Sequence, residues 1–168
     1  MTAMRKSAAA AGTALFFALT PGMVAGVVPW WLTGWRVGAR YPAPLRAAGI
    51  VMVAVGAAVL IHAFVRFVRE GVGTPAPVAP TRRLVVGGLY RYVRNPMYLA
   101  VLATITGQAL VLGRPVLLAY AATVAAAFVG FVYGYEEPTL ARRYGAAYEE
   151  YRRTVPAWYP RRPRRHRS

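Results

Sequence analysis

Cysteine and aspartate are both missing from the sequence, and its acidic residues are five glutamates. Without cysteine the chain can form neither a disulfide nor a thiolate metal site. Five carboxylates and two histidines, His62 and His166, are too few for a metal cluster. We therefore expect no metal cofactor.

The chain is rich in positively charged residues and in long apolar runs. Its 168 residues are 57% hydrophobic, yet its formal net charge is +16. The arginines gather between long uncharged runs, which is typical of a protein that crosses a membrane several times. We attribute the surplus to membrane topology and to contact with anionic lipid headgroups. The tail RRPRRHRS is the segment best suited to nucleic acid, but lipid is the nearer partner, so we expect no nucleic-acid partner.

Four apolar runs predict membrane-spanning helices, at residues 8–32, 47–65, 97–112 and 115–135. The first contains Pro21 and Pro29, and we interpret it as a retained span rather than a signal peptide. Its Gly22 and Gly26 form a small-xxx-small pair that predicts close helix packing. The third run gives only about 24 Å of helix, against a hydrocarbon core of about 30 Å. The residues before it are therefore expected at, or slightly below, the membrane surface.

A different periodicity begins at Glu136. Apolar and aromatic residues recur along one helical face, at Leu140, Tyr144, Tyr148, Tyr151 and Val155. The pattern predicts one amphipathic helix that lies in the membrane plane and stops at the VPAWYP stretch. The expected fold class is an all-α integral membrane protein with about four transmembrane helices and a C-terminal amphipathic interfacial helix.

The whole chain, residues 1–168, is expected to form one membrane domain. Residues 1–69 would hold the first two spans, residues 70–96 a loop, residues 97–135 a helical hairpin, residues 136–160 the amphipathic helix and its stop, and residues 161–168 a basic tail. The side that holds both termini carries 17 of the 21 Lys and Arg residues, and the other side carries 4. The positive-inside rule then places both termini and the loop in the cytoplasm. The abundance of Ala, Arg, Gly and Pro is compatible with a bacterial inner membrane.

Two arginines and the chain's only asparagine stand directly before the third apolar run, in the stretch GLYRYVRNPMY. Asn95 and Pro96 have an ordinary structural role, because asparagine caps helices and proline fits their first position. The same helix start exposes free N–H groups and a positive dipole end, which bind anions. Arg91 and Arg94 stand beside it, together with three tyrosines: Tyr90, Tyr92 and Tyr98. These residues suit a small anionic ligand with an aromatic portion.

Glu136 and Glu137 supply the opposite charge at the end of the fourth run. Antiparallel packing of the third and fourth runs would bring them near Asn95. Two carboxylates at a membrane boundary are costly unless paired, and salt bridges to nearby arginines are the simplest explanation. Alternatively, the arginines bind the carboxylate of a ligand and the glutamates bind its amine or diol. A zwitterionic, nucleotide-like amino acid carries all of these groups.

Two linked motifs resemble a known family. The pattern G-x-[YF]-x-x-x-R-[HN]-P-x-Y is met from Gly88 to Tyr98, and E-E-x-x-L-x-x-x-[YF]-G-x-x-Y-x-x-Y-x-x-x-V-P is met from Glu136 to Pro156. They resemble the isoprenylcysteine carboxyl methyltransferases and their relatives, the phospholipid N-methyltransferases, which are integral membrane enzymes that use S-adenosylmethionine. Many isoprenylcysteine enzymes have histidine at the position of Asn95. An asparagine cannot act as an acid or base near neutral pH, so we expect no proton transfer there.

The resemblance implies S-adenosyl-L-methionine as the methyl donor, without a metal. It implies that the following residues bind this cofactor: Gly88, Leu89, Tyr90, Arg91, Arg94, Asn95, Pro96, Tyr98, Glu136 and Glu137. The residues expected to act in catalysis are Arg94, Glu137 and Arg143. The acceptor would be a membrane lipid or isoprenoid-type molecule that presents a carboxylate or an amine. Near the end of the second run, His62 is either a packed or interfacial residue or a substrate contact.

Two other functions fit parts of the sequence. NADPH-dependent membrane sterol-type reductases carry a similar arginine-histidine-proline-asparagine-tyrosine stretch, but here Asn95 replaces the histidine and Met97 the following asparagine. A non-catalytic membrane adaptor, whose charges only set topology, would show no saturable cofactor binding. The expected function is S-adenosylmethionine-dependent methyl transfer.

Overall fold

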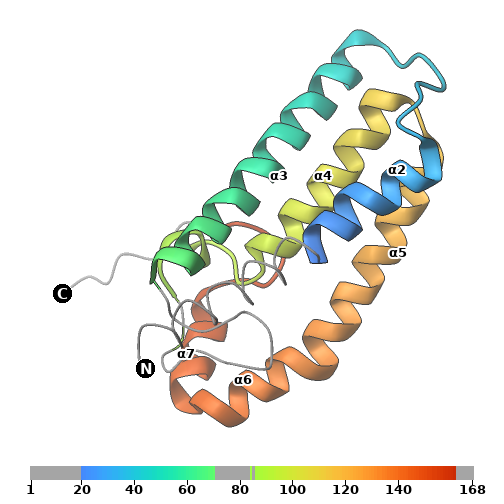
Figure 1. Cartoon of the computed structure of the whole chain (residues 1–168). Coiled ribbons are helices and arrows are strands. Elements are labelled where there is room, and N and C mark those ends of the chain that lie inside the picture. The colour runs from blue at the N-terminus through green and yellow to red at the C-terminus, as the bar shows by residue number, and fades with distance from the viewer. Residues whose placement is uncertain (1–19, 71–83, 85, 162–168) are drawn as a thin grey trace, which may run out of the picture.

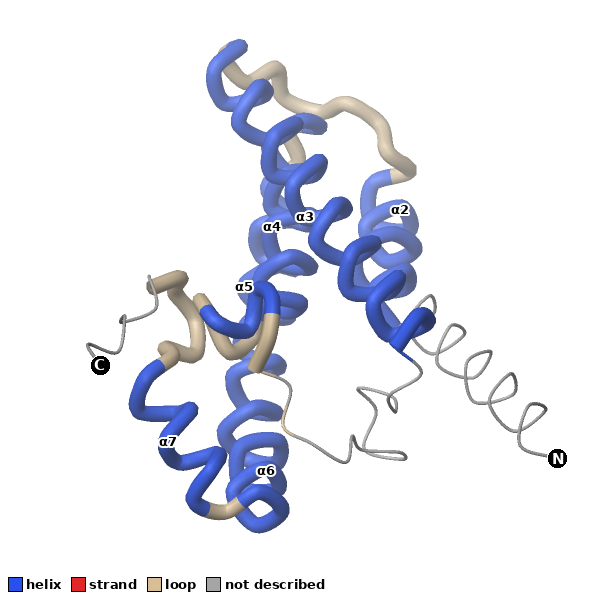
Figure 2. Tube along the Cα trace, turned by 90° about the vertical axis from the view of Figure 1, so that its left-hand side faces the viewer, coloured by secondary structure: helices blue, strands red, loops and turns tan. Residues whose placement is uncertain are grey.

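The computed structural model describes residues 20–70, 84 and 86–161, and these are helical with short connections (Figure 1). In chain order the elements are η1 (Met23–Val27), α2 (Val28–Thr33), α3 (Ala43–Glu70), η2 (Gly88–Arg91), α4 (Pro96–Leu112), α5 (Pro115–Phe131), η3 (Val132–Glu136), α6 (Glu137–Tyr144) and α7 (Ala146–Thr154). The described part contains no strand (Figure 2). The all-helical class predicted from the sequence is therefore confirmed.

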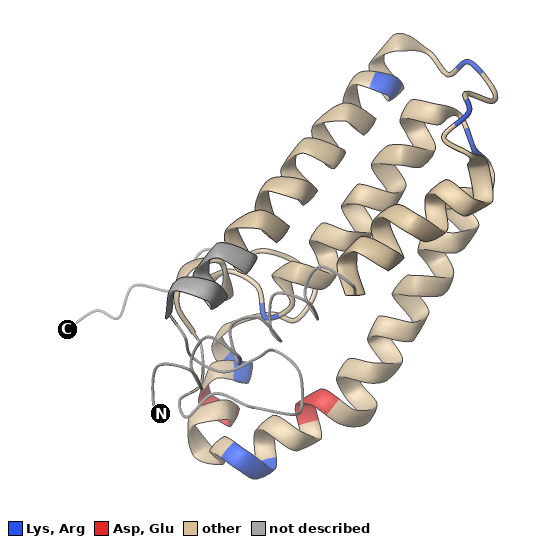
Figure 3. Ribbon diagram, viewed as in Figure 1, with Lys and Arg blue, Asp and Glu red and all other residues tan. Residues whose placement is uncertain are grey.

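The long helices form an antiparallel bundle. In Figure 1, η1–α2 and α4 run from the lower to the upper end of the bundle, while α3 and α5 run back. The short helices α6 and α7 fold back at the lower end, where α4 begins (Figure 1). Charged side chains lie at the two ends, and the middle of the bundle carries none in the described part (Figure 3).

Two helices are long and apolar enough to cross a membrane, Ala43–Ala63 and Pro115–Tyr144, and α4 is a shorter apolar helix. Of the first predicted span, residues 8–19 lie outside the described residues, as does most of the predicted loop before η2. Along α3 large apolar side chains are exposed, among them Ile50, Val51 and Ile61, each at least 60% exposed. Such a surface suits lipid rather than water.

The first helical segment, η1 and α2, is held to its neighbours by hydrogen bonds to its own backbone. Pro29 lacks an N–H, so the carbonyl of Ala25 cannot receive the usual helical hydrogen bond, and Gln108 Nε2 donates to it at 2.6 Å. The N–H of Val28 donates to Met23, five residues back, and the carbonyl of Val24 receives its hydrogen bond from the Tyr120 hydroxyl at 2.9 Å. In a hydrocarbon environment such carbonyls need partners, so these bonds fix the segment against α4 and α5.

Glycines bring α3 and α4 into close contact. A Cβ added to Gly49 would lie 2.7 Å from the carbonyl oxygen of Gly107, and one added to Gly107 would lie 2.6 Å from that of Gly49. A Cβ on Gly56 would lie 2.7 Å from the carbonyl oxygen of Ala100. The close packing predicted for Gly22 and Gly26 is wrong, because a Cβ at either position would meet nothing within 4 Å. The glycines that allow close helix packing lie instead in α3 and α4.

The amphipathic segment after Glu136 differs from the prediction in two ways. It does not begin a new element, because α5 continues through the π-helical turn η3 into α6. It is also not one helix, because Gly145, with φ +52° and ψ −128°, separates α6 from α7. Glycine adopts this left-handed conformation without the strain that a side chain would add. The bend turns α7 back toward the start of α4, which one straight helix would not reach (Figure 2).

We predict that Gly107→Ala destabilises the protein by about 1–3 kcal/mol, because the new methyl group overlaps the α3 backbone and the helices must separate. The matched control is Gly130→Ala in α5, where a Cβ meets nothing within 4 Å and stability should hold or rise by up to about 1 kcal/mol. The midpoints of thermal unfolding in detergent measure both. Equal midpoints for the two variants would contradict the close contact.

Candidate functional site

A buried ion pair lies at the lower end of the bundle (Figure 3). Arg94 precedes α4 and Glu137 begins α6, and Arg94 Nη1 lies 2.6 Å from Glu137 Oε1. Their side chains are only 11% and 10% exposed. Charges withdrawn from water this far are tolerated only when they are paired. The sequence left two alternatives for Glu137, a salt bridge to an arginine or contact with a ligand. The salt bridge is confirmed. Because Arg94 and Glu137 pair directly, they do not hold opposite ends of one ligand.

Two residues of α7 complete this cluster. The hydroxyl of Tyr148, whose residue is 2% exposed, accepts a hydrogen bond from Arg94 Nη1 at 3.1 Å. Burial, with the charge of Glu137, raises the pKa of Tyr148, so the hydroxyl stays neutral at physiological pH. Arg152 Nη1 lies 3.8 Å from the second oxygen of Glu137. Glu137 therefore faces two arginines, and its charge is already neutralised within the protein.

Residues 155–161, here the C-terminal strap, run beside the chain that leads into α4. The N–H of Arg94 donates to the carbonyl of Pro156 at 2.9 Å, and that of Arg161 donates to Tyr92 at 2.9 Å. Asn95 occupies the cap position of α4, but its side chain makes no cap hydrogen bond. Instead, its Nδ2 donates to the carbonyl of Ala157 at 3.2 Å. The predicted capping role of the asparagine side chain is therefore wrong, and the residue anchors the strap.

Glu136 stands apart from the ion pair and has a neutral partner. The Tyr98 hydroxyl donates to Glu136 Oε2 at 2.9 Å. The Tyr98 ring packs at 4.6 Å between centroids from Phe128 and at 6.4 Å from Trp158 of the strap. Trp158 Nε1 in turn donates to the Tyr133 hydroxyl at 3.1 Å. The carboxyl group of half-buried Glu136 therefore lies among aromatic side chains, with a tyrosine hydroxyl as its hydrogen-bond donor.

The remaining predicted site residues lie around the cluster at varying distances from it. Gly88, Leu89, Tyr90 and Arg91 form the turn η2, in which Gly88 has φ +60°, and Pro96 is buried at the first position of α4. The Tyr90 hydroxyl donates to Met97 Sδ at 3.5 Å. Arg143 is exposed on α6, its guanidinium 5.7 Å from the ring centre of Tyr144, and His62 is exposed on α3. An exposed His62 is compatible with an interfacial residue, so both alternatives for it stay predictions.

Sequence reasoning missed part of this arrangement. It treated Tyr151 as one of several residues on an apolar face, yet the Tyr151 hydroxyl donates to the carbonyl of Tyr90 at 2.8 Å and fixes η2. It took the VPAWYP stretch as a helix stop and overlooked Ala157 and Trp158. The sequence contained a signal for this packing: the segment after the charged helix is apolar, is bounded by prolines and contains a tryptophan, and such side chains are usually buried.

The residues fit S-adenosylmethionine as a ligand. Arg94 Nε is buried without a hydrogen-bond partner among the described residues. Glu136 is a carboxylate whose hydrogen-bond donor, the Tyr98 hydroxyl, is neutral. A buried donor on one side and a carboxylate facing a neutral partner on the other can be satisfied by a ligand that carries both charges. S-adenosylmethionine has a carboxylate, an ammonium and a sulfonium in one molecule.

An apolar helical bundle with its charges gathered at the ends is the arrangement expected of a membrane protein. Residues 45–147 match the model of the phospholipid methyltransferase family, and the chain belongs to that family. It is therefore a membrane methyltransferase that uses S-adenosylmethionine and acts on a lipid, as its motifs implied, and the reductase and adaptor alternatives lose their support. Neither the curated proteins nor the solved structures compared with the chain give a match.

We predict that Glu137→Gln destabilises the protein by about 3–5 kcal/mol, because it leaves the buried Arg94 guanidinium without a counter-charge. The control is Glu149→Gln, since Glu149 is 42% exposed and lies 3.6 Å from Arg152, where an ion pair contributes about 1 kcal/mol or less. Unfolding in detergent measures both. A Glu137→Gln variant as stable as the Glu149→Gln control would mean that the pair does not hold α4 to α6.

Proposed function

We propose that this protein transfers a methyl group from S-adenosylmethionine to a membrane-embedded lipid or isoprenoid-type acceptor at the cytoplasmic end of the bundle, beside Arg94, Glu136 and Glu137. Two observations carry the proposal: Arg94 Nε is buried without a hydrogen-bond partner among the described residues, and the carboxyl group of Glu136 has a neutral partner, the Tyr98 hydroxyl. Both side chains belong to elements that the family model spans.

The two glutamates have different roles in this proposal. Glu137 is held by Arg94 and Arg152, so it positions the Arg94 guanidinium for the carboxylate of the donor. Glu136 has the free charge and binds the ammonium or a ribose hydroxyl. Gly88, Leu89, Tyr90 and Arg91 would form the rim, and Asn95 and Pro96 would fix the chain entering α4. Tyr98 shapes the pocket with its ring and orients Glu136 with its hydroxyl.

Methyl transfer requires mainly that the protein align the donor with the acceptor and exclude water from both. The sulfonium of S-adenosylmethionine supplies an electrophilic methyl group, and positive charge disappears from sulfur as the methyl moves. A carboxylate acceptor is already a nucleophile, so its alignment and removal from water supply most of the rate. An amine acceptor must be neutral to attack, and a glutamate or a tyrosine would take its proton. Arg143, on the exposed face of α6, would contact an anionic part of the acceptor.

The membrane orientation follows from the charges. With 17 of the 21 Lys and Arg on the side of the termini, the site end of the bundle would face the cytoplasm, where S-adenosylmethionine is made. The four apolar segments would then cross a membrane of bacterial inner-membrane type, with α7 along its surface. The exposed arginines of α6 and α7, Arg142, Arg143 and Arg153, would meet anionic headgroups.

We predict that Arg94→Gln and Glu136→Gln each weaken S-adenosylmethionine binding about tenfold or more, because each removes a charged hydrogen-bond partner of the ligand. Titration calorimetry on the purified protein measures this. Glu150→Gln, on the exposed face of α7, is the control and should bind as the wild type does. Wild-type protein that takes up NADPH but no S-adenosylmethionine would overturn the assignment of the site.

A further inference from the structure

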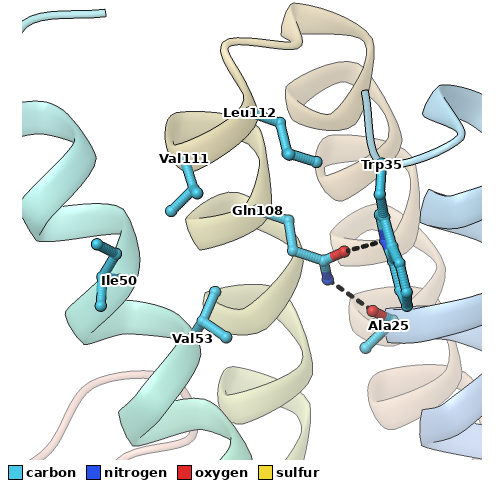
Figure 4. A pocket seen from close by; sticks show the side chains of 7 residues that line it. All are labelled: Ala25, Trp35, Ile50, Val53, Gln108, Val111 and Leu112. Carbon is cyan, nitrogen blue, oxygen red and sulfur yellow. Dashed lines mark hydrogen bonds between the residues drawn. The ribbon is translucent and has the colours of Figure 1, made fainter. Parts of the chain in front are cut away.

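An apolar groove runs along the bundle between the first helical segment and α3. One cavity, of about 440 Å³, is lined by Ala25, Trp35, Ile50, Val53, Gln108, Val111 and Leu112 (Figure 4). A second, of about 350 Å³, is lined by Pro21, Gly22, Ala25, Gly26, Ala57, Leu60 and Ile61. Ala25 lines both, so the two cavities are neighbours along the first helical segment, and we treat them as one groove. It exists because the first segment packs on α4 and α5 rather than on α3.

The groove extends from the level of the candidate site toward the opposite end. Gly49 faces Gly107 and Gly56 faces Ala100 across the α3–α4 contact. On this antiparallel register, Ile61 at the lower end of the groove lies level with the residue that precedes α4, Asn95. Ile50, at the other end, lies eleven residues earlier on α3, about 16 Å away. That length is about half of a hydrocarbon core of roughly 30 Å, the depth that one acyl chain fills.

Trp35 and Gln108 line the far end of the groove. Trp35 has φ +52°, a left-handed conformation that is strained for a residue with a side chain. Its indole Nε1 donates to Gln108 Oε1 at 3.2 Å, and Gln108 Nε2 donates to Ala25 (Figure 4). The connection that contains Trp35 is tied to the other side of the bundle by the N–H of Gly38, which donates to Leu112 at 2.8 Å. These hydrogen bonds hold Trp35 and Gln108 in place beside the groove.

We propose that this groove receives one acyl chain of the phospholipid acceptor, with the headgroup at the Arg94 end and the chain terminus toward Trp35. The inference rests on the proposed function for the identity of the headgroup site. Lipid tails are as apolar as the lining, so the groove gains no hydrophobic free energy over the bilayer. It acts by shape: it aligns the acceptor along the bundle and limits the length of chain that fits.

Gly26→Leu tests the groove, because a Cβ at Gly26 meets nothing within 4 Å and the new side chain can occupy the groove without disturbing the fold. Gly130→Leu, also in open space but on the exposed face of α5, is the matched control. We expect Gly26→Leu to lower methylation of long-chain phosphatidylethanolamine in vesicles about tenfold relative to a short-chain form, because the new side chain takes the space of several methylene groups of the acyl chain. Gly130→Leu should leave that ratio unchanged.

A second pair tests the opposite wall. Ala57 lines the groove and Ala58 is exposed on the outer face of α3, so Ala57→Phe should act like Gly26→Leu and Ala58→Phe should not. The phospholipid that remains bound to each purified protein, measured by mass spectrometry, reports the groove without catalysis and should fall for the two groove variants only. If neither groove variant changes retention or the chain-length ratio, or if only an isoprenoid acceptor is methylated, the inference is wrong. If retention falls but wild type methylates no lipid, the groove stands and the proposed function fails.

Discussion

The ion pair of Arg94 and Glu137 is the contact on which the lower half of the molecule depends. It joins the start of α4 to the start of α6, and Tyr148 of α7 shares the same guanidinium nitrogen. Because both charges are almost wholly removed from water, neither can leave without a large loss of stability. Apolar contacts alone would not fix how far one helix is shifted along another. The ion pair fixes this register at the end of the bundle where we propose the ligand site. The strap then closes the arrangement through the backbone of Arg94 itself.

The upper half is fixed by a different physical requirement, the need of backbone carbonyls for partners in a hydrocarbon medium. Pro29 and the π-helical turn η1 free the carbonyls of Ala25 and Val24, and Gln108 and Tyr120 take them up. These bonds tie the first segment to α4 and α5 and leave the side toward α3 open. The gap that results is the groove. A local backbone effect of one proline therefore contributes to the groove that we propose for the acyl chain.

The fold and the site were predictable to different extents. Helical periods, span lengths and the paired glutamates are local properties, so the all-helical class and the salt bridge to an arginine could be inferred from the sequence. The bend at Gly145 could not, because glycine between two charged helical stretches is equally compatible with one continuous helix. The close packing predicted from the spacing of Gly22 and Gly26 was wrong, since this spacing alone does not show whether another helix packs against the two glycines. The capping prediction for Asn95 failed for a similar reason: its side chain donates instead to the carbonyl of Ala157, 62 residues later in the chain.

The family match and the site geometry constrain different parts of the function. The match runs over residues 45–147 and so includes both glutamates and Arg94, but it ends before Tyr148, Tyr151 and the strap. Those later residues nevertheless hold Arg94 and η2 in place through Tyr148 and Tyr151. The groove likewise takes one wall from α3, within the match, and one from the first segment, outside it. Methyl transfer thus belongs to the shared core of the family, and the choice of lipid in this protein would depend on the segments at either end.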